Sequence, residues 1–159
     1  MKIFTFVAML ALVLSAPLAA APADTTAQAI HPAAFNPAAD ADKEIHLAIA
    51  EAGSSHKKIL LDVGGNWCKW CKMLDAFFES TPDVSRLLHD KYVVVKVNFS
   101  KENENKAVLS RYPKVAGYPH FFVLNSDGTL LCSKNTGELE KGQGYDAVKM
   151  KAFLTQWAK

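Results

Sequence analysis

The chain has 159 residues, 50% of them hydrophobic, which is enough apolar side chain for one compact domain with a core. Its 18 basic and 16 acidic residues give a formal net charge of +2 and are mixed along the sequence. This balance excludes the strongly basic surface that nucleic-acid binding requires. No nucleic-acid partner is therefore expected.

The N-terminal residues have the pattern of a secretory signal. Lys2 supplies a positive start, and residues 3–14 form an apolar run that is too short to span a membrane. Small residues follow, and residues 21–23 fit a cleavage site before Asp24; cleavage after Ala20 and retention as an uncleaved anchor are alternatives. We therefore expect a signal peptide over residues 1–23 and a soluble protein in the periplasm, an oxidising compartment.

The predicted domain boundaries follow from composition. Residues 24–36 are rich in Ala, Thr and Pro and predict a flexible leader, so the folded domain is expected over residues 37–159. A helix is predicted to start at residues 36–37, with Asn as the cap and Pro in the first turn, and to stop at Gly53. Residues 59–63 predict a buried strand that leads into a glycine-rich turn.

The remaining elements alternate in type. A helix is predicted up to Ser80, and a second one restarts at residues 81–83. The later predictions are a β-branched strand over 92–99, a polar helix over 101–112, a strand over 121–124, a turn at 125–128, a strand over 129–133 and a helix over 145–157. This order predicts an α/β fold with a central mixed sheet flanked by helices and an N-terminal helical extension.

Two cysteines two residues apart, Cys68 and Cys71, follow the first predicted strand and Trp67. If they open the next helix, their sulfurs lie within disulfide distance and the helix N-terminus stabilises a thiolate. Cys68, nearer the helix start and more exposed, would attack a disulfide, and Cys71 would resolve the adduct. The alternatives are a structural disulfide and half a metal site, although zinc would need two more ligands at recognisable spacing. Cys132, in an apolar strand, is expected to be a buried, inert thiol.

Over residues 40–159 the chain resembles the thioredoxin superfamily. Four features carry the resemblance: the Trp67-Cys68-x-x-Cys71 motif, Asp62 six residues before Cys68, Lys96 in a β-branched strand, and Gly117-Tyr118-Pro119. The resemblance implies a thioredoxin fold in which Cys68 and Cys71 are the redox pair.

The resemblance also implies roles for the neighbouring residues. Asp62 would be a buried acid near Lys96 that takes the proton of Cys71 through a water molecule; a purely structural ion pair or loop cap is the alternative. A cis peptide bond before Pro119 would leave the Tyr118 backbone free to pair with an extended substrate, and an ordinary trans proline is the alternative. From the residues themselves, Trp67 and Trp70 could form an apolar platform for substrates; the alternative is that one lies in the core and the other shields Cys71.

Three short segments depart from the thioredoxin pattern. Lys69 and Trp70 stand between the cysteines, where Lys69 would add positive charge beside Cys68 and Trp70 would shield Cys71. A Gly64-Gly65 pair replaces the bulkier residues usual before the motif, and Tyr118 precedes the proline. These positions tune redox potential and substrate fit, so the direction of electron flow stays open.

The expected function is that of an exported thiol-disulfide oxidoreductase, a reductase or isomerase rather than an oxidant. Its partners would be protein or peptide disulfides and a membrane or periplasmic redox protein that keeps the pair reduced. Neither an organic cofactor nor a metal is expected. One alternative is a Cu(I) metallochaperone that holds the ion between Cys68 and Cys71, because soft thiolates suit Cu(I). Another is a structural module of a larger assembly.

Overall fold

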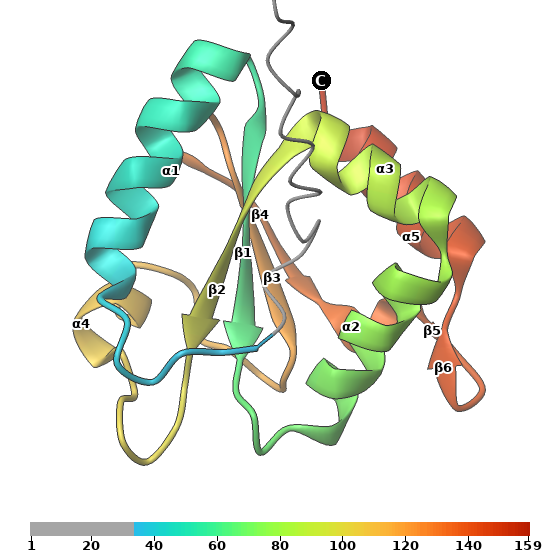
Figure 1. The fold of residues 1–159 in the computed structure, drawn as a ribbon, viewed down its shortest axis with the longest axis horizontal. Coiled ribbons are helices and arrows are strands. Elements are labelled where there is room, and N and C mark those ends of the chain that lie inside the picture. The colour runs from blue at the N-terminus through green and yellow to red at the C-terminus, as the bar shows by residue number, and fades with distance from the viewer. Residues whose placement is uncertain (1–33) are drawn as a thin grey trace, which may run out of the picture.

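A computed structural model describes residues 34–159 and places a four-stranded sheet between two layers of helices (Figure 1). The strand order is β2-β1-β3-β4. Strand β1 pairs in parallel with β2 and antiparallel with β3, which in turn pairs antiparallel with β4. The strands are β1 Lys58–Gly64, β2 Tyr92–Asn98, β3 His120–Leu124 and β4 Leu130–Asn135. The predicted mixed sheet is therefore confirmed.

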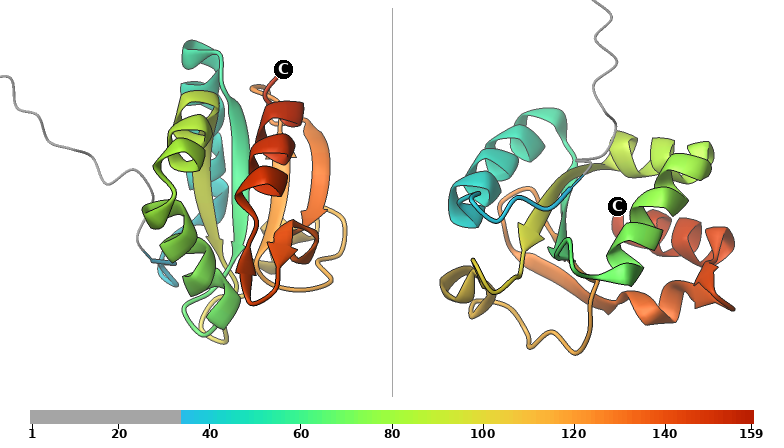
Figure 2. Two further views of the ribbon diagram at one scale, coloured as in Figure 1. Left: turned by 90° about the vertical axis from the view of Figure 1, so that its right-hand side faces the viewer. Right: turned by 60° about the horizontal axis from the view of Figure 1, so that its bottom comes forward.

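Helices cover both faces of the sheet. Helix α1 lies on one face, whereas α2, α3 and α5 lie on the other, as the turned views also show (Figure 2). The helices are α1 Ala41–Ser55, α2 Lys69–Ser80, α3 Pro82–Lys91, the short α4 Lys106–Leu109 and α5 Ala147–Trp157. A 3-10 turn over Thr136–Leu139 and the small hairpin of β5 Glu140–Lys141 and β6 Gly144–Tyr145 precede α5.

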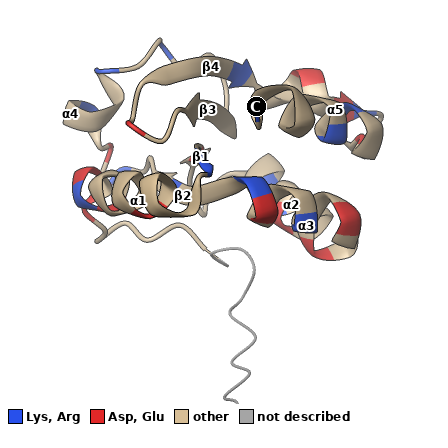
Figure 3. Ribbon diagram, turned by 90° about the horizontal axis from the view of Figure 1, so that it is seen from above, with Lys and Arg blue, Asp and Glu red and all other residues tan. Residues whose placement is uncertain are grey.

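Alternation along β1 divides the core into two clusters. Ile59, Leu61 and Val63 pack with α1, while Leu60 packs with the side chains of α2, α3 and α5. Because successive strand residues point to opposite faces, Asp62 lies on the α2 side of the sheet. Basic and acidic residues are interspersed along the outer helices (Figure 3). Within residues 34–159, no helix combines the length and hydropathy needed to span a membrane.

The first helix differs from its prediction at both ends. Helix α1 begins at Ala41 rather than at residue 36, because the Asp40 side chain accepts hydrogen bonds from the backbone N–H groups of Asp42 and Lys43. The helix also passes Gly53 and ends at Ser55, and its C-cap residue His56 adopts a left-handed conformation with φ of 55°. The predicted start and stop signals were therefore wrong by a few residues.

The predicted polar helix over residues 101–112 is reduced to the single turn of α4. Asn103 and Asn105 use their side-chain amides to bind backbone carbonyls, with Asn105 Nδ2 donating to the Asn98 carbonyl at 2.7 Å. Asn105 also has a positive φ of 45°. Side-chain bonds of this kind compete with helical hydrogen bonds, so the chain forms a loop before α4.

The folded domain begins earlier than the predicted boundary at residue 37. Phe35 is buried, with 3% of its surface exposed, although the prediction places it in a flexible leader over 24–36. The predicted signal peptide over 1–23 and most of that leader lie outside the residues that the structure describes.

Candidate active site

The two motif cysteines form a disulfide at the start of α2. Strand β1 ends at Gly64, and a short turn carries the chain to Cys68, the N-cap residue of the helix. Its Sγ accepts a hydrogen bond from the Cys71 backbone N–H at 3.1 Å, and the two Cα atoms are 5.2 Å apart. Once the disulfide is reduced, the positive end of the helix dipole favours the Cys68 thiolate.

Both sulfurs are shielded from solvent in this disulfide form. The exposed fractions are 4% for Cys68 and 1% for Cys71, so the predicted difference in exposure is present but small. Phe35 packs directly against both cysteines, and Trp70 and Tyr118 cover the cluster further. Little of either sulfur is therefore in contact with solvent while the disulfide is formed.

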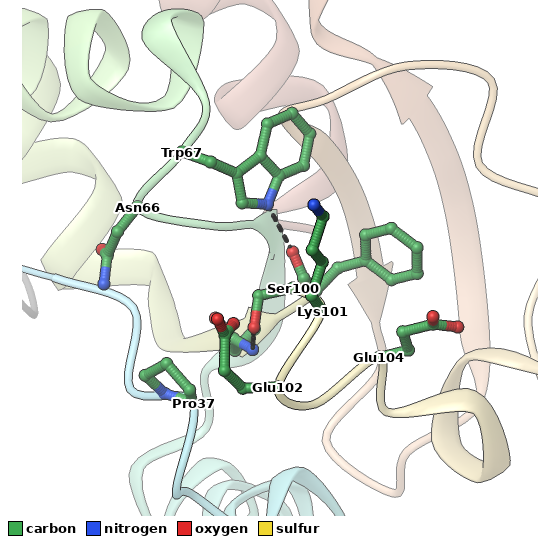
Figure 4. A pocket seen from close by; sticks show the side chains of 9 residues that line it. Pro37, Asn66, Trp67, Ser100, Lys101, Glu102 and Glu104 are labelled. Atoms are coloured by element: carbon green, nitrogen blue, oxygen red, sulfur yellow. Dashed lines mark hydrogen bonds between the residues drawn. The ribbon is translucent and has the colours of Figure 1, made fainter.

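Trp67 is the large exposed side chain beside the disulfide, with 58% of its surface exposed. Its indole Nε1 donates to the Phe99 carbonyl at 2.7 Å (Figure 4). A methyl group at Gly65 would lie only 2.5 Å from Trp67 Nε1 and 2.7 Å from the Phe99 oxygen, so this bond requires glycine at that position. Gly65 thus leaves room for the indole, and the hydrogen bond to Phe99 holds it at the edge of the site.

The aromatic surface continues from Trp67 to the proline loop. The Trp67 ring meets the Tyr118 ring edge-on at 5.5 Å, and Tyr118 stacks on Phe99 at 4.9 Å. Burial raises the pKa of Tyr118, so its hydroxyl stays neutral. A pocket of about 620 Å³ adjoins this surface, lined among others by Trp67, Phe99 and Glu102 (Figure 4). The arrangement offers an apolar platform next to the disulfide.

The Tyr118–Pro119 peptide bond is cis, as the resemblance implies. The Thr136 hydroxyl donates to the Pro119 carbonyl at 2.6 Å and ties this loop to the end of β4. His120 follows, with Nε2 and the Ser133 hydroxyl 2.9 Å apart. His120 is thus a buried, hydrogen-bonded strand residue, and burial lowers its pKa.

A group of ionisable residues lies under the start of α2. Asp62 is 1% exposed and lies opposite Lys96 in the register of β1 and β2, so the expected proximity of the two is confirmed. The Lys96 ammonium, however, forms its ion pair with Asp75 of α2 at 2.5 Å. The sequence prediction missed Asp75, although its spacing of four residues from Cys71 places both on one face of the helix.

Tyr145 of β6 completes this group. Burial raises the pKa of its hydroxyl far above the ordinary value, and the carboxylates of Glu140, Asp62 and Asp75 raise it further. The ring of Tyr145 meets Trp70 edge-on at 5.8 Å. Trp70 therefore packs towards β6, whereas Lys69, the other residue between the cysteines, is exposed beside Cys68.

Within residues 34–159, no group of three or more His, Cys, Asp and Glu side chains is arranged to hold a metal ion. Cys132 is a free thiol in β4, opposite Val123 of β3 and apart from the disulfide. It is half-buried rather than fully buried, and burial raises its pKa.

A disulfide at the first turn of α2, after the central strand of a mixed sheet and packed against a cis-proline loop, defines a thioredoxin-like redox protein. The sequence matches the family model described as Thioredoxin-like over residues 40–126, and the chain belongs to that family. The resemblance found in the sequence is therefore confirmed.

The matching relatives are named as thiol:disulfide interchange proteins. The chain is 32% identical over 104 residues to DsbD of Citrobacter koseri and 26% identical over 114 residues to DsbD of Klebsiella pneumoniae. These matches cover 65% and 72% of this chain, respectively. In both cases the matched region is 18% of the relative's length, so the chain corresponds to a small part of those proteins.

Solved structures agree with the fold. A disulphide isomerase from Xylella fastidiosa is 27% identical with a TM-score of 0.68, and the match covers 79% of this chain and 96% of that one. The C-terminal domain of oxidised DsbD from Neisseria meningitidis is 22% identical with a TM-score of 0.57, covering 75% and 97% of the two chains. The second likeness concerns the fold alone.

Proposed function

We propose that this protein is a thiol-disulfide oxidoreductase that exchanges disulfides with protein or peptide substrates, as a reductase or isomerase. The observation that carries the proposal is the Cys68–Cys71 disulfide at the start of α2, packed against the loop of cis-Pro119. The names of the relatives, interchange proteins and a disulphide isomerase, support the same chemistry.

The exchange begins with the reduced pair. The Cys68 thiolate attacks one sulfur of a substrate disulfide, which forms a Cys68–substrate mixed disulfide and releases the other substrate sulfur as a thiolate that takes up a proton. Cys71 then loses its proton and attacks Cys68 Sγ, which releases the second substrate thiol. Two electrons and two protons pass to the substrate, and the Cys68–Cys71 disulfide remains.

The surroundings of the pair support separate roles for the two cysteines. Cys68 caps α2, next to the exposed Lys69, so its thiolate is the better stabilised of the two. Asp62, buried on the α2 side of β1, would accept the Cys71 proton through a water molecule during resolution. Trp67, Tyr118 and Pro119 would hold the substrate, with the Tyr118 backbone pairing with an extended segment.

An exported location completes the proposal. The signal-like pattern at the N-terminus supports transfer across the inner membrane to the periplasm, where disulfides persist. A reductase or isomerase in an oxidising space needs an electron donor, and a membrane or periplasmic thiol-disulfide protein would supply those electrons.

Insulin reduction with dithiothreitol as donor tests the activity. Wild-type protein should accelerate the reaction, whereas Cys68→Ser should not, and Cys132→Ser serves as the matched thiol control. No acceleration by the wild type would refute the proposal, and tight Cu(I) binding by such an inactive protein would favour the metallochaperone instead.

Trapping in cells tests the two cysteine roles. Cys71→Ser keeps the attacking thiol and lacks the resolving one, so mixed disulfides with partners should accumulate and appear on non-reducing gels after acid quenching. Cys68→Ser should accumulate few of them. Accumulation in Cys68→Ser alone would show that the roles are reversed.

A further inference from the structure

Phe35 lies against the disulfide although it is far from the cysteines in sequence. Its side chain forms a buried cluster with Cys68 and Cys71, and 3% of its surface is exposed. The ring also lies under the Lys96 ammonium, with 4.6 Å between Nζ and the ring centroid. Phe35 therefore touches both the redox pair and the ionisable group beneath it.

Gly64 provides the space that the ring occupies. A methyl group at Gly64 would lie 2.6 Å from Cys71 Sγ and 2.9 Å from Phe35 Cζ. The ring edge and the sulfur thus converge on the same point above the end of β1. In the thioredoxin pattern a bulkier residue stands at this position. Here the residue is Gly64, and the ring of Phe35, from another part of the chain, occupies the space instead.

Two asparagines hold the segment that carries this ring. Asn66, two residues before Cys68, accepts from the Phe35 N–H at 3.1 Å and donates to the Phe35 carbonyl at 2.8 Å. Asn103 donates to the carbonyls of Pro37 at 3.0 Å and Ala39 at 3.3 Å. The segment ahead of α1 thus crosses the end of the sheet where β1 and β2 finish (Figure 1).

We propose that Phe35 is a positioning residue of the redox centre, whose ring fills the space over Gly64 and keeps water away from the Cys71 sulfur. This role of Phe35 rests on the proposed exchange function, because it concerns the cysteine that would resolve the mixed disulfide. A resolving cysteine that is closed to solvent attacks the neighbouring Cys68 sulfur and stays out of side reactions with other thiols and oxidants. The two hydrogen bonds between the Asn66 side chain and the Phe35 backbone hold the ring in place.

Loss of the ring has a defined electrostatic effect. Water that enters beside Cys71 solvates its thiolate better than the neutral thiol, so the pKa of Cys71 should fall. The charged and titratable groups around this site belong to four elements and the proline loop: Asp62 on β1, Lys96 on β2, Asp75 on α2, Tyr145 on β6 and Tyr118 before Pro119. All of these side chains are kept in Phe35→Ala, in which the Lys96 ammonium loses its contact with the ring.

Alkylation of Cys71 measures the effect directly. In the full chain with Cys68→Ser and Cys132→Ser, Cys71 is the remaining thiol, and its rate with iodoacetamide is followed against pH. Phe35→Ala should raise the rate by about tenfold or more and shift the pH midpoint downward. Phe35→Leu, which keeps an apolar side chain, should stay within about threefold of the parent. Leu47→Ala, on the exposed side of α1, is the matched control and should change nothing.

Asn66→Ala provides an independent variant, because it loosens the segment and leaves the ring intact. Its alkylation rate should rise by about threefold or more, which decides the question if Phe35→Ala does not fold. Rates within about twofold of the parent in folded Phe35→Ala, or in Asn66→Ala, would overturn the proposal. The assay needs no substrate, so an inactive wild type in the insulin assay would refute the exchange function and leave this result valid.

Discussion

Lys96 of β2 and Asp75 of α2 form an ion pair of 2.5 Å beneath the redox disulfide, with side chains only 3% and 16% exposed. The pair links the sheet to the helix that begins with the cysteines. Asp62 lies next to Lys96 in the β1–β2 register, so two carboxylates share the surroundings of one buried ammonium group. This arrangement makes the stability of the domain depend on the charges under its active site.

Asp75→Ala should lower the free energy of unfolding by about 3 kcal/mol, because it removes the carboxylate that pairs with a buried ammonium group. The double variant Asp75→Ala/Lys96→Met should lose less than Asp75→Ala alone, since it removes the charge as well. Urea unfolding of the oxidised protein gives both values. Asp83→Ala, which breaks an exposed pair with Lys151, is the control and should cost at most about 1 kcal/mol. If the double variant lost as much stability as Asp75→Ala and Lys96→Met lose together, this account would be contradicted.

Asp62→Asn should slow the release of substrate from a preformed Cys68 mixed disulfide, mostly near neutral pH, because an amide cannot accept the Cys71 proton. Single-turnover release of the substrate thiol across the pH range is the measurement. Asp83→Asn, an exposed acid on α3, is the matched control. If the release rate depends on pH in the same way in the wild type and in Asp62→Asn, then Asp62 does not accept the Cys71 proton.

His120 should make the protein less stable in mild acid. Burial lowers its pKa from the ordinary 6.5, so below that pH the unfolded chain binds a proton that the native state does not. The free energy of unfolding should therefore fall as the pH drops from 6.5 towards the lowered native pKa. His120→Gln should flatten this part of the profile, measured by urea unfolding at several pH values. His46→Gln, at an exposed position, should keep the wild-type slope.

Cys132 should be a spectator of the exchange reaction. It lies in β4 away from the disulfide, and burial raises the pKa of its thiol, so it should react slowly with alkylating reagents at pH 8. Cys132→Ser should keep insulin reduction within about threefold of the wild type and cost about 1 kcal/mol of stability, because a hydroxyl replaces an apolar sulfur. A large loss of turnover would show that the third cysteine takes part.

The features of the site that could be predicted from neighbouring residues are the cysteine pair and the elements on either side of it. The Cys68–Cys71 spacing and the apolar run before it predicted a strand, a turn and a helix start, and the structure confirms that order. The cis bond before Pro119 was also predicted correctly, but through the resemblance, since sequence spacing alone does not distinguish the two isomers.

The missed features depend on contacts between distant residues. Phe35 stands in an Ala- and Pro-rich segment without periodicity, and its partner Asn66 is 31 residues away, so composition predicted a flexible leader. Residues 101–112 have a helix-like composition, but Asn103 and Asn105 bind distant or non-helical carbonyls instead. Asp75 was overlooked because an acidic residue on an amphipathic helix is most often exposed.

The position of Phe35 has a practical consequence for anyone who shortens this chain. The family match starts at residue 40 and helix α1 at Ala41, so both boundaries suggest that the preceding residues are dispensable. A fragment cut there would keep every strand and the Cys68–Cys71 pair, yet it would lose the ring that packs with this pair. Reactivities measured on such a fragment would describe a different redox centre, and fragments for assays or crystals should retain residue 34 onward.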